Sequence, residues 1–173
     1  MNLLKWLAGI VVTAWLGQYL LAMALPNMIM ELLHRQGGKE RGVNQLVLTP
    51  PPDENAREVV RPSPDLLYAI CIYDLSDGPL LIEAPVPPRY WSMQFYQMNT
   101  DNFAGFSNQR SDAYRVGSTL KVLLLGPGQE PGIVDGELVR SPTQRGVMLL
   151  RASAIGEQYP QLTALKASTC RPV

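Results

Sequence analysis

The chain has 173 residues and a balanced charge, with 15 Lys and Arg side chains against 15 Asp and Glu. A nucleic-acid-binding face would leave an excess of basic residues, so we expect no nucleic-acid partner. One histidine and two cysteines exclude a metal cage built from many His or Cys ligands. The chain contains neither a P-loop nor a dinucleotide-binding glycine motif, and we expect no metal and no cofactor.

The first predicted element is a membrane anchor helix over residues 1–34. Residues 6–30 contain no charged side chain, and these 25 positions exceed the roughly 20 that a helix needs to cross a bilayer. A cleaved signal peptide is the alternative, because Ala22, Met23 and Ala24 have the small-x-small form of a cleavage site. We favour the uncut anchor, since the apolar run continues beyond Ala24 and exceeds an ordinary signal core.

The direction of insertion depends on two opposing patterns. Lys5 precedes the apolar run, whereas Arg35, Lys39 and Arg41 follow it, and this count favours a cytoplasmic C-terminal side. The signal-like character of the first 25 residues favours export. We predict a single-pass signal anchor in the inner membrane, with the following domain in the periplasm.

The predicted domain follows a linker and a proline-rich arm at residues 35–60, and it occupies residues 61–173. Apolar, β-favouring segments between turn residues predict strands at 66–73, 80–84, 90–98, 119–125, 137–140 and 147–152. The last two are expected to form a hairpin around residues 141–146. Helical spacing of Tyr159, Leu162 and Leu165 predicts one short helix at 156–167. Strands without intervening helices indicate a mainly β fold, an antiparallel sandwich or barrel.

The strand at 90–98 alternates between two kinds of side chain. Tyr90, Gln94 and Tyr96 share one face, and the opposite face is apolar. Aromatic rings beside polar groups suit the binding of sugars or flat ligands. We therefore predict that these three residues and Asn102 bind a ligand, although aromatic residues of a sandwich are more commonly core residues.

Catalytic candidates are few. Asp65, Tyr68 and Asp101 are weak candidates, because an Asp beside a turn more commonly caps that turn through its side chain. Paired carboxylates for glycoside hydrolysis must face one cleft, and Glu83 is a further candidate for such a pair. His34 is the single histidine of the chain and lies about thirty residues from any motif. We therefore do not expect a Ser-His-Asp triad.

The two cysteines, Cys71 and Cys170, form an even pair that an oxidising compartment would allow to form a disulfide. Such a bond would tie the C-terminal segment to the first predicted strand of the domain. The alternative is that Cys71 is a small buried side chain without a covalent partner.

Four segments in order resemble one bacterial family. They are RPSPDLLY at 61–68, DLSDGP at 74–79, RYWSMQFY at 89–96 and NTDNF at 99–103. Together they are similar to the family called domain of unknown function 1254. The chain departs from the family pattern at Pro64, where Asn is usual, and at Leu66, where Thr is common.

The resemblance implies a β-sandwich related to jelly rolls, and an exported protein. Longer members carry a second β domain of unknown function (1214), so this chain resembles a short, membrane-anchored form that works with a separate protein partner. We expect a non-catalytic accessory or binding protein of the cell envelope. One alternative is an envelope enzyme or enzyme subunit that acts on a glycan or other polar substrate. Another is a helper of a membrane complex whose helix packs through Gly9, Ala14 and Gly17.

Overall fold

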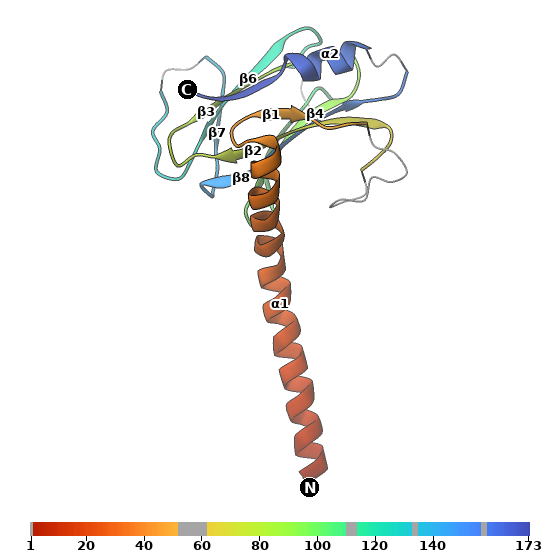
Figure 1. Cartoon of the computed structure of the whole chain (residues 1–173), viewed down its shortest axis with the longest axis vertical. Coiled ribbons are helices and arrows are strands. Elements are labelled where there is room, and N and C mark those ends of the chain that lie inside the picture. The colour runs from red at the N-terminus through yellow and green to blue at the C-terminus, as the bar shows by residue number, and fades with distance from the viewer. Residues whose placement is uncertain (1, 52–61, 110–113, 133–134, 157–158) are drawn as a thin grey trace.

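The computed structural model describes residues 2–51, 62–109, 114–132, 135–156 and 159–173. A single long helix, α1 (Asn2–Arg41), projects from a two-layered β domain (Figure 1). Forty residues of helix correspond to a length of roughly 60 Å. The predicted fold class is confirmed: the chain is mainly β, with one long apolar N-terminal helix and a short C-terminal helix.

The strands form two sheets, which we call sheet A and sheet B. Sheet A has the spatial order β1 (Leu46–Leu48), β2 (Leu66–Asp74), β8 (Arg145–Ser153), β4 (Trp91–Gln97) and β5 (Asn102–Ser107). Sheet B has the order β7 (Glu137–Arg140), β6 (Thr119–Leu125), β3 (Leu80–Pro85) and β9 (Thr169–Pro172). The short helix α2 (Tyr159–Ala167) packs against β3, β8 and β2.

The core fills the space between the two sheets. In β4, Trp91, Met93 and Phe95 point inward and are completely buried, as the alternation in the sequence predicts. The inward residues of β2, β3, β6 and β8 complete one continuous apolar cluster, and Leu165 of α2 joins it. Burial of these side chains is the main stabilising contribution to the sandwich.

A disulfide joins the two sheets. Cys71 lies in β2 of sheet A, Cys170 lies in β9 of sheet B, and the two residues are 99 positions apart in the sequence. Both side chains are buried in the core. The bond therefore closes a long loop and links the layers through their interior.

The predicted hairpin at 137–152 is wrong, because its two strands belong to different sheets. β7 pairs with β6 in parallel, whereas β8 pairs with β2 and β4 in sheet A. The backbone N–H of Ser141 still donates to Leu125 O of β6, so the chain leaves sheet B only after this residue. The observed connection has four residues, 141–144, and it crosses from sheet B to sheet A instead of forming a tight hairpin turn.

Several boundaries also differ from the sequence-based expectation. α1 continues to Arg41 instead of ending at residue 34, because its C-terminal turns are buried against sheet A. The strands β1, β5 and β9 were not predicted; two of them have only three or four residues. Most of the expected proline-rich arm, residues 52–61, lies outside the described residues, as do residues 157–158 before α2. The domain limits at 34, 60 and 61 remain predictions.

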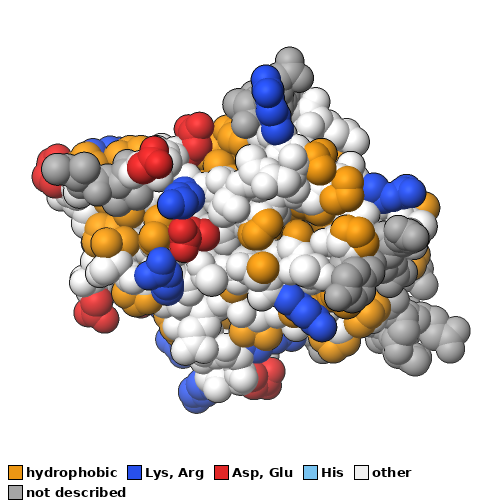
Figure 2. Space-filling model, turned by 90° about the horizontal axis from the view of Figure 1, so that it is seen from above, with side chains coloured by type: hydrophobic (Ala, Val, Ile, Leu, Met, Phe, Trp, Pro, Cys, Tyr) orange, Lys and Arg blue, Asp and Glu red, His pale blue; other side chains and the backbone are white. Residues whose placement is uncertain are grey.

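The end of the sandwich that faces away from the N-terminus of α1 has a mixed surface. Figure 2 shows acidic, basic and apolar side chains interspersed on this face. Among the described side chains drawn there, neither sign of charge gathers into a continuous patch.

A buried tyrosine makes stability dependent on pH. The Tyr73 hydroxyl lies 3.2 Å from Tyr96 O and 3.0 Å from Ser141 Oγ, and its burial raises the pKa of Tyr73 to about 12. An unfolded tyrosine loses its proton near pH 10, so the folded state keeps a proton that the unfolded state releases.

We therefore expect the free energy of unfolding to fall between pH 10 and about 12. The contribution of Tyr73 is complete below pH 10, and its loss proceeds at up to roughly 1.4 kcal/mol per pH unit as the pH rises. Urea denaturation at several alkaline pH values measures this slope. The Tyr73→Phe variant should show a flatter profile, and equal slopes in the two proteins would contradict the assignment.

Candidate functional site

The outer face of sheet A is the surface on which the candidate residues gather, and it has two halves. Strand register places Tyr68 of β2 opposite Arg151 of β8, and Arg151 opposite Ser92 of β4. Two residues earlier in β8, Leu149 lies between Ile70 of β2 and Gln94 of β4. We call the half that contains Arg151 open, because among the described residues α1 packs over the other half, which contains Ile70 and Ile72.

The covered half is an apolar seat for the end of α1. Met30 of the helix packs with Ile72 and Val147, and Leu33, Ile70, Tyr96 and Met98 surround this small cluster. Gly37 is buried at the contact, where a Cβ atom would lie 2.6 Å from Cδ1 of Ile72. The helix therefore approaches the sheet closely in its last three turns, and the side chains before Met30 are almost all exposed.

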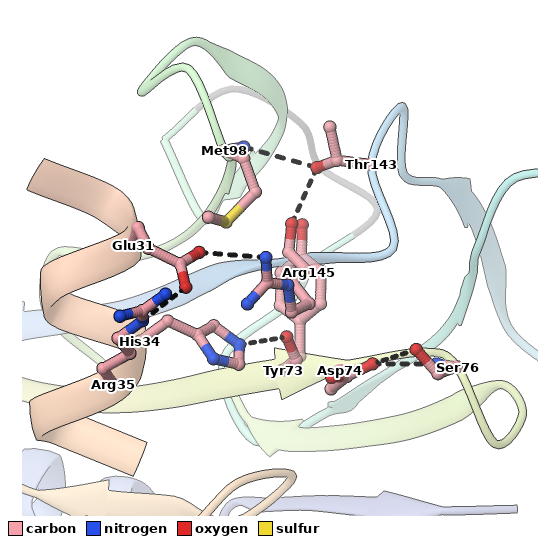
Figure 3. A network of polar contacts seen from close by, with 9 residues as sticks. All are labelled: Glu31, His34, Arg35, Tyr73, Asp74, Ser76, Met98, Thr143 and Arg145. Carbon is pink, nitrogen blue, oxygen red and sulfur yellow. Dashed lines mark hydrogen bonds and ion pairs between the residues drawn. The ribbon is translucent and has the colours of Figure 1, made fainter. Parts of the chain in front are cut away.

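Polar contacts surround the apolar seat (Figure 3). Glu31 accepts from the guanidinium groups of Arg145, at 2.9 Å, and Arg35, at 2.8 Å. The ring nitrogen Nε2 of His34 lies 3.1 Å from Tyr73 O. His34 is therefore bonded to the strand backbone and takes part in the docking of the helix.

Asn44 connects the segment after α1 to sheet A through side-chain hydrogen bonds. Its backbone has a left-handed φ of 60°, and its side-chain amide exchanges two 2.8 Å hydrogen bonds with the backbone of Asp74. Burial by itself would raise the pKa of the Asp74 carboxyl, but the hydrogen bonds from Ser76, together with the charges of His34 and Arg145, lower it. The carboxylate at the end of β2 is therefore stabilised in its ionised form.

The helix seat can be tested through Gly37. We expect Gly37→Leu to lower the free energy of unfolding by about 1–3 kcal/mol, because the new side chain must displace Ile72. Chemical denaturation of the full chain in detergent measures the change. Gly9→Leu is the matched control, because no atom lies within 4 Å of a Cβ at that position. Equal effects of the two substitutions would contradict the close approach.

The open half carries polar and aromatic side chains from the four neighbouring strands β2, β8, β4 and β5. Ser92 Oγ accepts from the Tyr90 hydroxyl at 3.0 Å and from Arg151 Nε at 3.2 Å. On the next row, Asn102 donates a 2.8 Å hydrogen bond to Gln94. We call the set Tyr68, Tyr90, Ser92, Gln94, Asn102 and Arg151 the open face.

Glycine makes room for part of this surface. A Cβ at position 105 would lie 2.5 Å from Oε1 of Gln94, so the absence of a side chain lets Gln94 extend across β5. Gln94 reaches Asn102 across this gap and is held there. Both residues belong to the predicted ligand-binding set, and their role in binding stays a prediction.

The predicted ligand residues are divided between the two halves. Tyr90, Gln94 and Asn102 belong to the open face, whereas Tyr96 packs at the edge of the helix seat. Arg151 was not predicted. Its signal in the sequence was a single charged residue inside the apolar run 147–152, at an outward position of that strand.

The catalytic candidates do not converge. Asp65 immediately precedes β2, and its carbonyl oxygen accepts from Ala154 beyond the end of β8. Asp101 lies in the turn beyond β4, whose residue Gln97 pairs with the start of β8. Seven residues of strand separate the two ends, which is roughly 23 Å. Glu83 belongs to sheet B and pairs with Arg171 at 3.1 Å, so these three carboxylates do not face one cleft.

Asp101 has a structural role in the turn between β4 and β5. Oδ2 of Asp101 accepts from the side chain of Asn99 at 2.7 Å, and the backbone N–H of Asp101 donates to Asn99 Oδ1 at 3.0 Å. These contacts stabilise the turn between β4 and β5. In the described part of the chain, no group of three or more His, Cys, Asp or Glu side chains is placed to hold a metal ion.

Comparison with known families decides what the domain is. The family model described as "Protein of unknown function (DUF1254)" matches residues 43–172. The chain belongs to this family. The matched region of the DUF1254 chain starts directly after α1 and includes every described strand.

A solved structure shares the fold of this DUF1254 domain. The crystal structure of the VPA0106 protein from Vibrio parahaemolyticus has a TM-score of 0.67 at 14% identity, and the match covers 90% of this chain and 36% of that one. An uncharacterized protein from Burkholderia cenocepacia has a TM-score of 0.48 at 17% identity, with coverage of 66% and 32%. The chain thus spans about a third of the length of each. A search of curated proteins finds no match.

The DUF1254 motifs supply most of the open face. Tyr68 comes from the segment at 61–68, and Tyr90, Ser92 and Gln94 come from the segment at 89–96. The first of these segments includes Arg61, which lies outside the described residues. The segment at 74–79 instead forms the turn between β2 and β3, where Gly78 has a φ of 148°. The segment at 99–103 forms the turn between β4 and β5 and also supplies Asn102. Three motifs therefore meet on the same surface.

Proposed function

We propose that this chain is an exported binding or accessory protein of the cell envelope, held in the inner membrane by α1 with its sandwich in the periplasm. The apolar part of the helix supports the anchor, because its most apolar stretch is long enough to span a bilayer and is entirely unburied. In an aqueous compartment, so many exposed apolar side chains would promote aggregation.

One observation carries the direction of insertion, namely the disulfide between Cys71 and Cys170. Disulfides persist in the periplasm and other oxidising compartments, and are rare where thioredoxin and glutathione keep thiols reduced. Both cysteines lie in the core, where an unbonded pair would face each other without solvent. The bond therefore favours export over the cytoplasmic orientation that the count of basic residues suggested.

The binding role rests on the outer face of sheet A. Apart from the buried Ser92, the side chains of its open face are partly or fully exposed, and the docked end of α1 orients this face relative to the membrane. A protein partner is part of the proposal, because the open face offers hydrogen-bonding side chains for contact with a second molecule.

A pair of reporter fusions tests the orientation. Alkaline phosphatase joined after Val173 is expected to be active, because that enzyme needs its own disulfides, whereas green fluorescent protein at the same position should be dark. A fluorescent fusion with inactive phosphatase would overturn the export proposal. The apparent mass of the chain distinguishes the two anchor alternatives. An uncut anchor keeps the full mass, whereas cleavage after Ala24 removes residues 1–24.

Purification tests the partner. Extraction from membranes in a mild detergent is expected to recover the chain together with a second protein in fixed proportion. Recovery of the chain alone, as a monomer under several extraction conditions, would count against the accessory role and leave the orientation unaffected.

A further inference from the structure

Arg151 is the one feature of the open face that the anchor and the fold do not explain. Its side chain is partly buried on the outer surface of β8, between Tyr68 and Ser92 on the flanking strands. Within the described residues, its single hydrogen-bond partner is the Ser92 hydroxyl, and no carboxylate lies within 4.0 Å of it.

The same strand supplies a direct comparison. Arg145 lies six residues earlier on the same face of β8, and its guanidinium is paired with Glu31 at 2.9 Å. On sheet B, Arg171 is likewise paired with Glu83 at 3.1 Å. A partly desolvated cation is stabilised by an anion, and Arg151 has none from this part of the chain.

The two neighbouring hydroxyl groups have different roles. Ser92 is buried, and its Oγ accepts from both Tyr90 and Arg151, so this oxygen holds the guanidinium in place. The Tyr68 oxygen accepts from the backbone N–H of Ser63 at 2.9 Å, which leaves its proton available to a ligand. The Tyr68 hydroxyl and the remaining guanidinium N–H groups together make a surface that is rich in donors.

We propose that Arg151, held by Ser92 and joined by the hydroxyl of Tyr68, binds the carboxylate group of a small organic acid. A guanidinium offers two parallel N–H groups that match the two oxygens of a carboxylate, and such bidentate pairs are among the stronger hydrogen-bonded contacts. The ring of Tyr90 and the side chain of Leu149 border the position and supply apolar contact for the body of the ligand. This inference deepens the proposed binding function and does not depend on the orientation in the membrane.

The test uses the full chain in detergent and two acids, glucuronate and benzoate, with glucose and benzamide as uncharged counterparts. Binding is followed through the NMR signal of the Arg151 Nε–H group and by isothermal titration. Each acid is expected to move that signal in a saturable manner, and at least one of them should bind ten times more tightly than its uncharged counterpart.

Variants identify the residues that bind. Arg151→Gln should weaken binding of the acid at least tenfold, and Arg151→Lys should restore only part of it, because an ammonium cannot form the bidentate pair. Arg115→Gln, at an exposed arginine away from the open face, is the matched control and should leave the affinity unchanged. Equal affinity of the wild type and Arg151→Gln would overturn the site.

Inorganic phosphate is the competing oxyanion. Displacement of the acid only by much higher phosphate concentrations would support the carboxylate, whereas tighter binding of phosphate would overturn that assignment. Lack of binding by either acid, with an active alkaline phosphatase fusion, would remove the carboxylate site and leave the export proposal standing.

Discussion

Removal of the disulfide is expected to lower the free energy of unfolding by about 4–5 kcal/mol. Cys71 and Cys170 close a loop of 99 residues, and the chain-entropy model assigns this magnitude to a loop of that size. Because the bond links β2 to β9, its removal releases the loop between them and raises the conformational entropy of the unfolded chain. The double variant Cys71→Ala/Cys170→Ala avoids free thiols and isolates this effect.

Urea denaturation of the double variant and the wild type measures the difference. The wild type in excess dithiothreitol is the matched control, and its unfolding midpoint should approach that of the variant. An unchanged midpoint after complete reduction would mean that the core alone holds the two sheets together. It would also remove the main support for an oxidising compartment.

The substitution Gly146→Ala is expected to cost about 3 kcal/mol, since overpacking of a dense core costs 1–3 kcal/mol and occasionally more. Gly146 lies in β8, opposite Tyr73 on one side and Gln97 on the other. A Cβ atom there would overlap both the Tyr73 hydroxyl and the carbonyl oxygen of Tyr96. The carbonyl belongs to a paired strand and cannot move without disturbing the sheet.

Gly132→Ala is the control, because no atom lies within 4 Å of a Cβ at that position. Thermal unfolding of both variants compares the same chemical change in a packed and an open site. Addition of Tyr73→Phe to Gly146→Ala removes the overlap with the hydroxyl but leaves those with the ring carbon Cζ of residue 73 and with Tyr96 O, so rescue should be partial. Full stability of Gly146→Ala would contradict the close packing at this point.

The sequence predicted those strands whose apolar residues form a run or an alternating pattern within one segment. The apolar run 119–125 corresponds to β6 residue for residue, and alternation in 90–98 correctly assigned Trp91 and Phe95 to the core. The sequence did not predict β1 or the change of sheet after Ser141. A three-residue strand has too few positions to show a period, and the choice of sheet depends on contacts between distant segments.

The candidate site was predicted in part for a similar reason. Alternation placed Tyr90, Gln94 and Tyr96 on one face, but it could not show that the end of α1 covers the last of them. His34 was considered only as a catalytic residue, and its bond to Tyr73 O depends on packing of two elements that are far apart in sequence. Only the register of β2, β8 and β4 shows that Arg151 lies beside Ser92 and Tyr68, and the sequence does not give this register.

The docking of α1 also sets an order of assembly. α1 leaves the ribosome before β8, which supplies Val147 and Arg145 to its seat and is made more than a hundred residues later. Met30 and His34 therefore lack their partners until β8 has been made. Seating of the helix on sheet A is a late step of folding, and under the proposed anchor role it would follow insertion of α1 in the bilayer.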